Sequence, residues 1–170
     1  HERCTRPLTP QTDRPGPYSG RGNENAWGAQ LADLLTRLMG ADMAAIGQTY
    51  DRAAQLEYPG GVTGHSWGDA DRFWMSLRAA FPDAAFAIHH SIGREDALMP
   101  PRAAVRWSLT GKHSGWGAFG APTGAPVHVM GITHAEFGPF GSAGWGLRRE
   151  YTLFDETAIW KQILLHTGDL

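Results

Sequence analysis

The fold of this chain is decided by the stretch AVRWSLT at residues 104–110, where apolar and polar side chains alternate. Val105, Trp107 and Leu109 fall on one side of an extended chain, and the residues between them fall on the other. This period of two predicts a strand with one buried face. Similar runs, rich in β-branched and aromatic residues, lie at 84–92, 127–137 and 145–154. Turn-forming residues separate the runs, so the second half of the chain is predicted to form a sheet.

The first half of the chain is predicted to be mainly helical. Leucine and tryptophan recur every three or four residues between 25 and 40, which is typical of one helical face. Further elements are expected at 42–50 (helix), 53–58 (strand) and 66–81 (helix), and a last helix begins at Asp155, a favourable N-cap residue. Helices that precede a run of strands indicate an α+β fold. We expect a curved antiparallel sheet that wraps around helices and leaves a cone-shaped pocket.

The start of the chain has a different composition from the rest. Residues 1–22 hold four prolines and little apolar material, which predicts a proline-rich arm or linker ahead of one domain at 23–170. Two interpretations of the arm stay open: a disordered tail, or a segment that wraps a partner subunit. Because the chain starts with His1 instead of Met, we expect a processed product or a piece of a longer protein.

Composition and charge exclude several classes of function. A formal net charge of -2 over 170 residues provides no concentrated basic face for nucleic acid. The single cysteine, Cys4, can form neither an internal disulfide nor a cysteine-based zinc site. No apolar run approaches the ~18 residues of a membrane-spanning helix, and no signal-peptide pattern is present. We therefore expect a protein without a cysteine-bound zinc ion and without a nucleic-acid or membrane partner, with the cytoplasm as its default location.

Several short motifs, in the same order along the chain, resemble those of a known family. They are FW and FPD within 73–83, AVRWSLTGKH at 104–113, APTGAPV at 121–127, GIT at 131–133, and FDE with WKQ within 154–162. The likeness extends over about residues 26–165 and is to the SnoaL-like polyketide cyclase family of the nuclear transport factor 2-like superfamily. This resemblance implies a cystatin-like roll that forms a homodimer through its sheet.

The resemblance also implies a chemistry. Relatives include cofactor-free cyclases that close a ring by an intramolecular aldol reaction, for which a carboxylate base, a nearby histidine and an apolar pocket suffice. The histidine of the family aligns with His134, but its aspartate aligns with Thr152. Glu150 is the carboxylate expected on the same strand face, one strand repeat or ~6–7 Å away.

His134 and Glu150 are therefore the candidate catalytic residues, and each has a structural alternative. His134 shares a strand face with Met130, and it is a candidate base near neutral pH if that face points into the pocket. The alternative is a buried histidine bonded to the backbone or to a carboxylate. Alternation places Arg148 on the face of Glu150, so an ion pair between them is the alternative to a base with a raised pKa.

The candidate substrate-binding residues are those expected to surround the pocket. They are Tyr58, His65, Trp74, Trp107, Met130 and Thr152. The aromatic members can equally be core residues, and His65 can be a loop residue before a helix. His89 and His90 are adjacent on a strand and face opposite ways, so we expect no shared metal site there. Asp155 is better explained as a helix cap than as a catalyst.

Three functions stay open. The first, which we prefer, is a cofactor-free enzyme of polyketide cyclase or isomerase type that acts on a small hydrophobic carbonyl compound by acid–base catalysis. The second is a non-catalytic module that holds a small apolar ligand. The third is a dimerisation domain of a longer protein, which the proline-rich arm favours.

Overall fold

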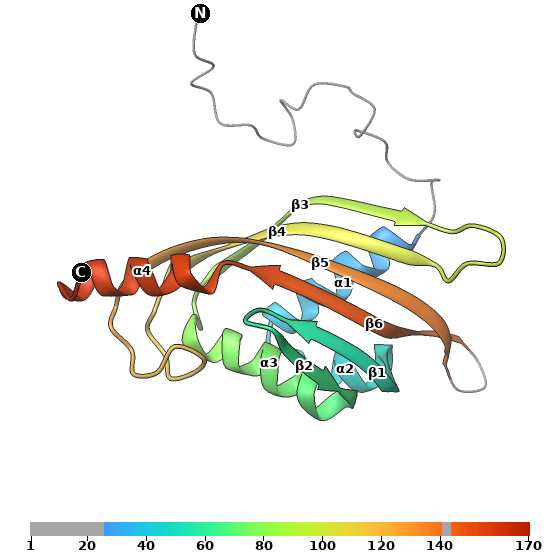
Figure 1. Cartoon of the computed structure of the whole chain (residues 1–170), viewed down its shortest axis with the longest axis horizontal. Helices are drawn as coiled ribbons and strands as arrows, with labels where there is room; N and C mark the ends of the chain where they lie inside the picture. Colours follow the sequence, from blue (N-terminus) through green and yellow to red (C-terminus); the bar gives the residue numbers. More distant parts are fainter. Residues whose placement is uncertain (1–25, 141–143) are drawn as a thin grey trace, which may run out of the picture.

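The computed structural model describes residues 26–140 and 144–170, so the expected arm at 1–22 lies outside the described residues (Figure 1). The helices are α1 Trp27–Met39, α2 Ala44–Thr49, α3 Ser66–Ala80 and α4 Glu156–Thr167. The strands are β1 Tyr50–Tyr58, β2 Val62–His65, β3 Ala85–Arg94, β4 Arg102–Lys112, β5 Pro126–Phe140 and β6 Gly144–Phe154. The predicted α+β class is confirmed, and β2 is an element that was not predicted.

The six strands form one curved, open sheet in the order β2-β1-β6-β5-β4-β3. All neighbours are antiparallel except β1 and β6, which run parallel. The expectation of a wholly antiparallel sheet is therefore wrong at this pair. A tight turn makes neighbouring strands antiparallel, but β1 and β6 are connected through α3 and other strands, so no turn sets their direction. Strand β2 follows a turn in which Gly60 and Gly61 have φ of 81° and 73°, a conformation that favours glycine.

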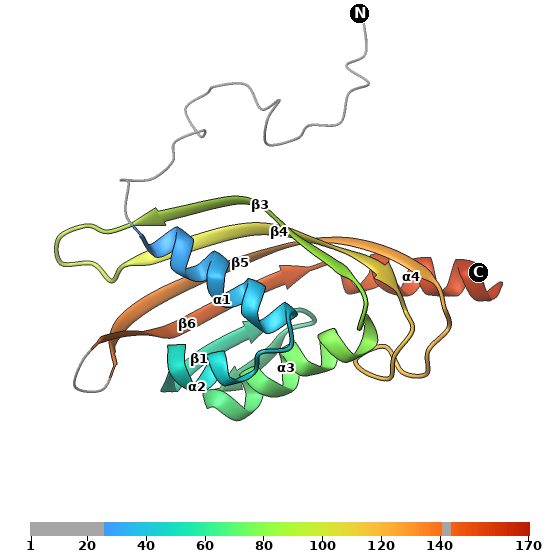
Figure 2. The ribbon, with the colours of Figure 1, turned by 180° about the vertical axis from the view of Figure 1, so that it is seen from behind.

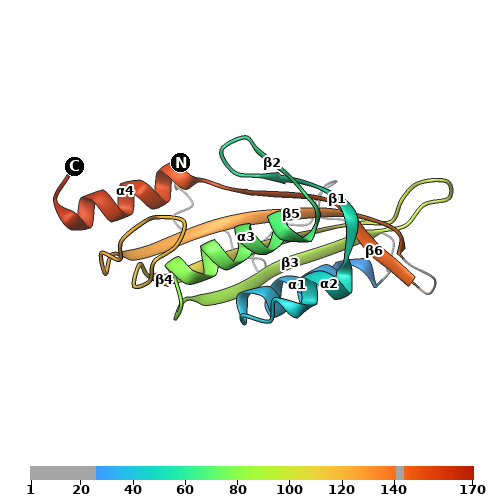
Figure 3. The same ribbon diagram turned by 90° about the horizontal axis from the view of Figure 1, so that it is seen from below.

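Helices α1 and α3 cover the concave face of the sheet, as Figures 1 and 2 show from opposite sides. Helix α1 lies across β3 and β4, and α3 lies beside β1 (Figure 3). The predicted inward face of β4 is confirmed, because Val105, Trp107 and Leu109 are all buried. The Trp107 ring packs against Gly131 of β5, where a Cβ would overlap the indole. A glycine at that position therefore makes room for one of the two largest fully buried side chains.

A β-bulge in β6 changes which residues face inward. Leu147 and Arg149 pair with consecutive residues of β5, so Arg148 is an extra residue with no partner across the ladder. Leu147 and Glu150 are both buried, although a regular strand would place these two positions on opposite faces. The bulge therefore decides that Glu150 points into the domain.

Helix α4 begins as predicted, because the Asp155 carboxylate accepts a hydrogen bond from the Ala158 backbone N–H at 3.0 Å. The helix lies against the part of β5 that extends beyond β6. The Gln162 side chain accepts from the backbone N–H of His128 at 2.9 Å and donates to its carbonyl at 3.0 Å. These bonds cover a strand edge that could otherwise pair with another chain. Within 26–140 and 144–170, no helix combines the length and apolarity needed to cross a membrane.

Candidate functional site

Glu150 is the centre of a polar cluster inside the domain. It is 1% exposed and lies on the concave side of β6. The hydroxyl of Tyr50, at the start of β1, donates a hydrogen bond to Oε1, and the Thr152 hydroxyl donates to Oε2 at 2.8 Å. Burial raises the pKa of Glu150, and the surrounding donors offset only part of this effect. Such a carboxyl group can exchange a proton nearer to neutral pH than an exposed one.

A series of polar contacts ties Glu150 to the core of the sheet. Thr152 Oγ1 lies 3.0 Å from Thr133 Oγ1 of β5, and the indole N–H of Trp107 donates to Thr133 Oγ1 at 3.1 Å. Both threonines are fully buried. Because these groups come from three adjacent strands, the sheet itself holds the carboxyl group in position.

Two further donors approach Glu150 without a partner of their own. The Tyr58 hydroxyl of β1 and the Trp74 indole N–H of α3 are buried, and within the described residues neither makes a hydrogen bond of normal geometry. Both nevertheless lie close enough to Glu150 to favour its charged form. Burial, and then the charge of Glu150, raise the pKa of Tyr58 far above its ordinary value, so its hydroxyl keeps its proton. The cluster therefore contains two buried donor groups, the Tyr58 hydroxyl and the Trp74 indole N–H, that have no acceptor within the described residues. Buried polar groups in proteins are rarely left without a hydrogen-bond partner.

A hollow of about 260 Å³ lies beside this cluster, between the β1–β2 hairpin, α3 and the start of α4. Phe73, Phe119 and Phe154 contribute apolar walls, and Tyr58 is also part of the lining. The Tyr58 and Phe73 rings are stacked, with their centroids 3.8 Å apart. Glu150 does not line the hollow, so Tyr58 is the residue that the hollow and the cluster share.

The structure does not bring His134 to Glu150. Thr133 and Ala135, on either side of His134, are buried, so the alternation of β5 turns His134 to the outer face of the sheet. Its ring lies there beside Tyr151, with centroids 5.8 Å apart. Partial burial lowers the pKa of His134. The expectation that His134 faces the pocket together with Glu150 is therefore wrong.

Other predicted residues are divided between the two faces. Met130 is half exposed on the outer face, so its expected place in the pocket is also wrong. Arg148 is the bulged residue and is exposed, which removes the expected ion pair with Glu150. His65 is exposed before α3, and its backbone N–H donates to the Asp69 carboxylate at 2.8 Å. The predicted residues that gather around Glu150, directly or through Thr133, are Tyr58, Trp74, Trp107 and Thr152.

Two members of the cluster, Tyr50 and Thr133, were not predicted from the sequence. Tyr50 fell at the end of an expected helix, although it begins β1 and is buried like Leu56 and Tyr58 on the same strand. An earlier start for this strand would have indicated its inward position. Thr133 lies in the GIT motif and adjoins His134, so assigning His134 to the outer face would have placed Thr133 inside. In the described part of the chain, no group of three or more His, Cys, Asp or Glu side chains could hold a metal ion.

Comparisons with known proteins agree with this fold. A family model described as a SnoaL-like domain matches residues 31–138. The structure of IdmH from Streptomyces antibioticus, a proposed polyketide cyclase, is similar with a TM-score of 0.63 at 17% identity, over 82% of this chain and 99% of that one. No curated protein sequence matches the chain.

Two other solved structures are similar to the same extent. A proposed polyketide cyclase from Acidithiobacillus ferrooxidans gives a TM-score of 0.64 at 18% identity, over 85% of this chain and 99% of that one. A proposed ketosteroid isomerase from Shewanella frigidimarina gives 0.59 at 12% identity, over 76% of this chain and 96% of that one. At these identities the likeness establishes the fold alone.

Proposed function

The chain belongs to the SnoaL-like domain family. We propose that it is a cofactor-free enzyme that catalyses proton transfer at a carbon of a small hydrophobic carbonyl compound. The observation that carries the proposal is the buried Glu150, whose pKa is raised and which lies near two buried donors that make no hydrogen bond within residues 26–140 and 144–170. A carboxylate base beside donors for a developing negative charge is the arrangement that enolate chemistry needs.

In the proposed reaction, the Glu150 carboxylate removes a proton from the carbon next to the substrate carbonyl. The electron pair of that C–H bond moves onto the carbonyl oxygen, which becomes an enolate oxygen. The Tyr58 hydroxyl and the Trp74 indole N–H, which have no hydrogen-bond acceptor among the described residues, donate to it. The enolate carbon then attacks a second carbonyl and closes a ring, whose alkoxide takes the proton back from Glu150. Alternatively, Glu150 returns the proton to another carbon and isomerises the compound.

The hollow supplies the apolar part of the proposed site. Its phenylalanine walls suit a flat hydrophobic body, which would rest against Phe73 and Phe154. Because Tyr58 separates the hollow from Glu150, the substrate carbonyl reaches the carboxyl group only when the stacked Tyr58 and Phe73 rings move apart. Two structural neighbours named as proposed polyketide cyclases and one named as a proposed ketosteroid isomerase support this substrate class.

The test is proton exchange at the carbon next to a carbonyl. Proton NMR in D2O would follow 2-tetralone and 1-indanone, two flat ketones, with the wild type and with Glu150→Gln. We expect the wild type to accelerate exchange, and Glu150→Gln to lose about 10²–10⁴-fold of the rate. The matched control is His134→Gln, which lies on the outer face and should exchange like the wild type.

Equal exchange rates in the wild type and Glu150→Gln would exclude Glu150 as the base. If both proteins are stabilised by the ketones but neither accelerates exchange, the chain is a non-catalytic binding module that uses the hollow alone. Thermal unfolding with each ketone separates these cases, since a ligand that binds the folded state raises the melting temperature.

We also propose that two copies of the chain pair through the outer face of the sheet. Met130 and Ile132 of β5 and Leu153 of β6 are 52%, 53% and 62% exposed, and Ile132 pairs with Leu153 across the ladder. These side chains border a shallow hollow of about 360 Å³ on this face. An exposed apolar area of this kind is typical of a protein–protein interface. Analytical ultracentrifugation should show a dimer that Leu153→Asp weakens; a monomeric wild type at high concentration would refute the pairing.

A further inference from the structure

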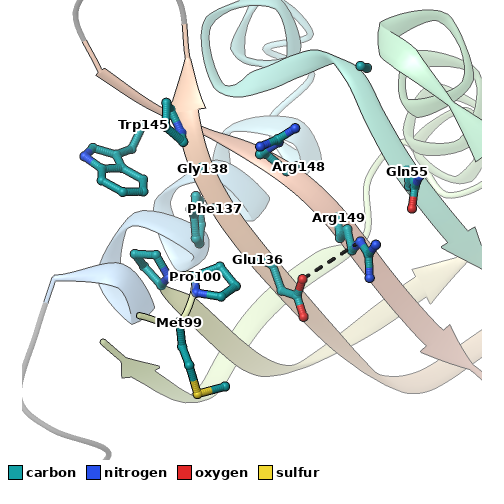
Figure 4. Close-up of a pocket in the computed structure, with 12 residues that line it drawn as sticks. Gln55, Met99, Pro100, Glu136, Phe137, Gly138, Trp145, Arg148 and Arg149 are labelled. Atoms are coloured by element: carbon teal, nitrogen blue, oxygen red, sulfur yellow. Dashed lines mark ion pairs between the residues drawn. The ribbon is translucent and has the colours of Figure 1, made fainter. Parts of the chain in front are cut away.

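A third hollow, which at about 630 Å³ is larger than the other two, lies at the end of the sheet away from α4. Strands β1, β5 and β6 and the loop before β4 form its walls. Arg149 of this hollow and Glu150 of the buried cluster are adjacent on β6 and face opposite sides, so the hollow is separate from the proposed active site. Figure 4 shows its polar wall, Arg148, Arg149 and Gln55, and its apolar wall, Trp145, Pro100 and Met99.

Arg148 owes its place in this hollow to two features of the backbone. It is the extra residue of the β6 bulge, which frees its side chain from the regular alternation. Its side chain then lies across Gly138 of β5, where a Cβ would overlap the Arg148 Cδ. A bulge and a glycine on adjacent strands therefore leave room for the Arg148 side chain over β5.

The charge of Arg148 has no counterpart within the described residues. No ion pair or hydrogen bond joins its guanidinium to another described side chain, although the chain as a whole has a net charge of -2. Its neighbour Arg149 lies 4.0 Å from the Glu136 carboxylate, which is longer than a hydrogen bond. The hollow thus presents guanidinium N–H groups as donors. A carboxylate can accept two hydrogen bonds from one guanidinium at the same time.

The apolar wall is also held in place. Trp145 is 53% exposed, but its ring packs edge-on against Trp27 of α1, with centroids 5.9 Å apart at an interplanar angle of 73°. Pro100 and Pro139, which have a fixed φ, line the same hollow. A half-exposed ring that its neighbours keep in one orientation is suited to contact with a flat ligand.

We propose that this hollow is a second binding site, and that it takes a small aromatic carboxylate. The carboxylate binds the guanidinium of Arg148, and the aromatic body lies against Trp145 and Pro100. Glu136 limits the affinity, because its charge opposes that of the ligand and it competes for Arg149. The site is independent of Glu150 and needs no chemistry there.

The test is a titration with 2-naphthoate, followed by NMR line broadening of the ligand and by calorimetry, at low salt. We expect the wild type to bind naphthoate and not the neutral 2-naphthamide. Arg148→Gln should weaken binding at least about tenfold, as loss of a charged hydrogen bond does. Glu136→Gln should strengthen it, since a negative charge is removed. Lys161→Gln, which removes an exposed charge on α4, is the control and should bind like the wild type.

A second variant moves the charge without removing it. Gly138→Ala should weaken binding because its Cβ displaces the Arg148 stem. If this variant unfolds, Arg148→Gln at its exposed position decides the question. Equal affinity in Arg148→Gln and the wild type would overturn the proposal, and so would the absence of binding to the wild type. Loss of naphthoate binding in Glu150→Gln would instead assign the ligand to the buried cluster, whereas retained binding separates the two sites.

Discussion

Replacing Glu150 by glutamine should stabilise the protein at neutral and alkaline pH. Glu150 is 1% exposed, and burial raises its pKa above the value in the unfolded chain. Between these two pKa values the folded protein holds a proton that the unfolded chain has released. The free energy of unfolding of the wild type therefore falls as pH rises through this window, and it stays at the lower level above the folded pKa.

The magnitude follows from a single proton. Inside the window, one group changes the free energy of unfolding by about 1.4 kcal/mol per pH unit. The glutamine side chain keeps the shape and can still accept from Tyr50 or Thr152, but it has no charge to desolvate. For a domain of this size, each kcal/mol corresponds to about 2–4 °C in melting temperature. The advantage of Glu150→Gln should therefore grow by several degrees as pH rises.

The assay is thermal unfolding by circular dichroism, from about pH 4, near the ordinary pKa of glutamate, upwards. The quantity of interest is the difference in melting temperature between variant and wild type at each pH. Glu57→Gln, which changes an exposed glutamate of β1, is the matched control and should follow the wild type. If the difference in melting temperature between Glu150→Gln and the wild type stayed constant over the pH range, the assignment of a raised pKa to Glu150 would be refuted.

Three other substitutions test the core, a helix cap and the proposed chemistry. Gly131→Ala should cost about 1–3 kcal/mol in urea unfolding, because its Cβ would overlap the Trp107 indole. Gly68→Ala is the control: its Cβ meets open space on the exposed side of α3, so it should leave stability unchanged or raise it by up to about 1 kcal/mol. Asp155→Ala should cost about 1 kcal/mol by loss of the α4 N-cap, and a full cost for Asp155→Asn as well would contradict this reason. Tyr58→Phe should leave the fold intact and slow ketone proton exchange about 10²–10³-fold, by analogy with loss of an oxyanion donor. An unchanged rate would remove Tyr58 from the proposed mechanism.

Much of the local structure could be predicted from the sequence, because its causes lie within a few residues. The alternation of Val105, Trp107 and Leu109 correctly indicated the buried face of β4. Asp155 was correctly predicted to cap α4, since a carboxylate reaches a backbone N–H only three residues away. The α+β class was correctly predicted for a similar reason, because the local periods of the apolar residues indicated helices in the first half of the chain and strands in the second.

The side of the sheet on which each candidate catalytic residue lies could not be predicted in the same way. Alternation alone assigned Arg148 and Glu150 to one face, but a bulge is set by the pairing of β6 with β5, and so by another part of the chain. His134 was assigned to the pocket through its family position, although the burial of Thr133 turns it outward.

The sequence by itself therefore determined the family and the order of the elements other than β2, and it indicated Glu150 as a candidate catalytic carboxyl group. Only the tertiary structure decided what surrounds that carboxyl group. Tyr50 and Tyr58 reach it because β1 pairs in parallel with β6, and Trp74 reaches it because α3 packs on the concave face. The physical reason is that a buried charge is governed by desolvation and by donors from distant segments, and these exist only once the chain has folded.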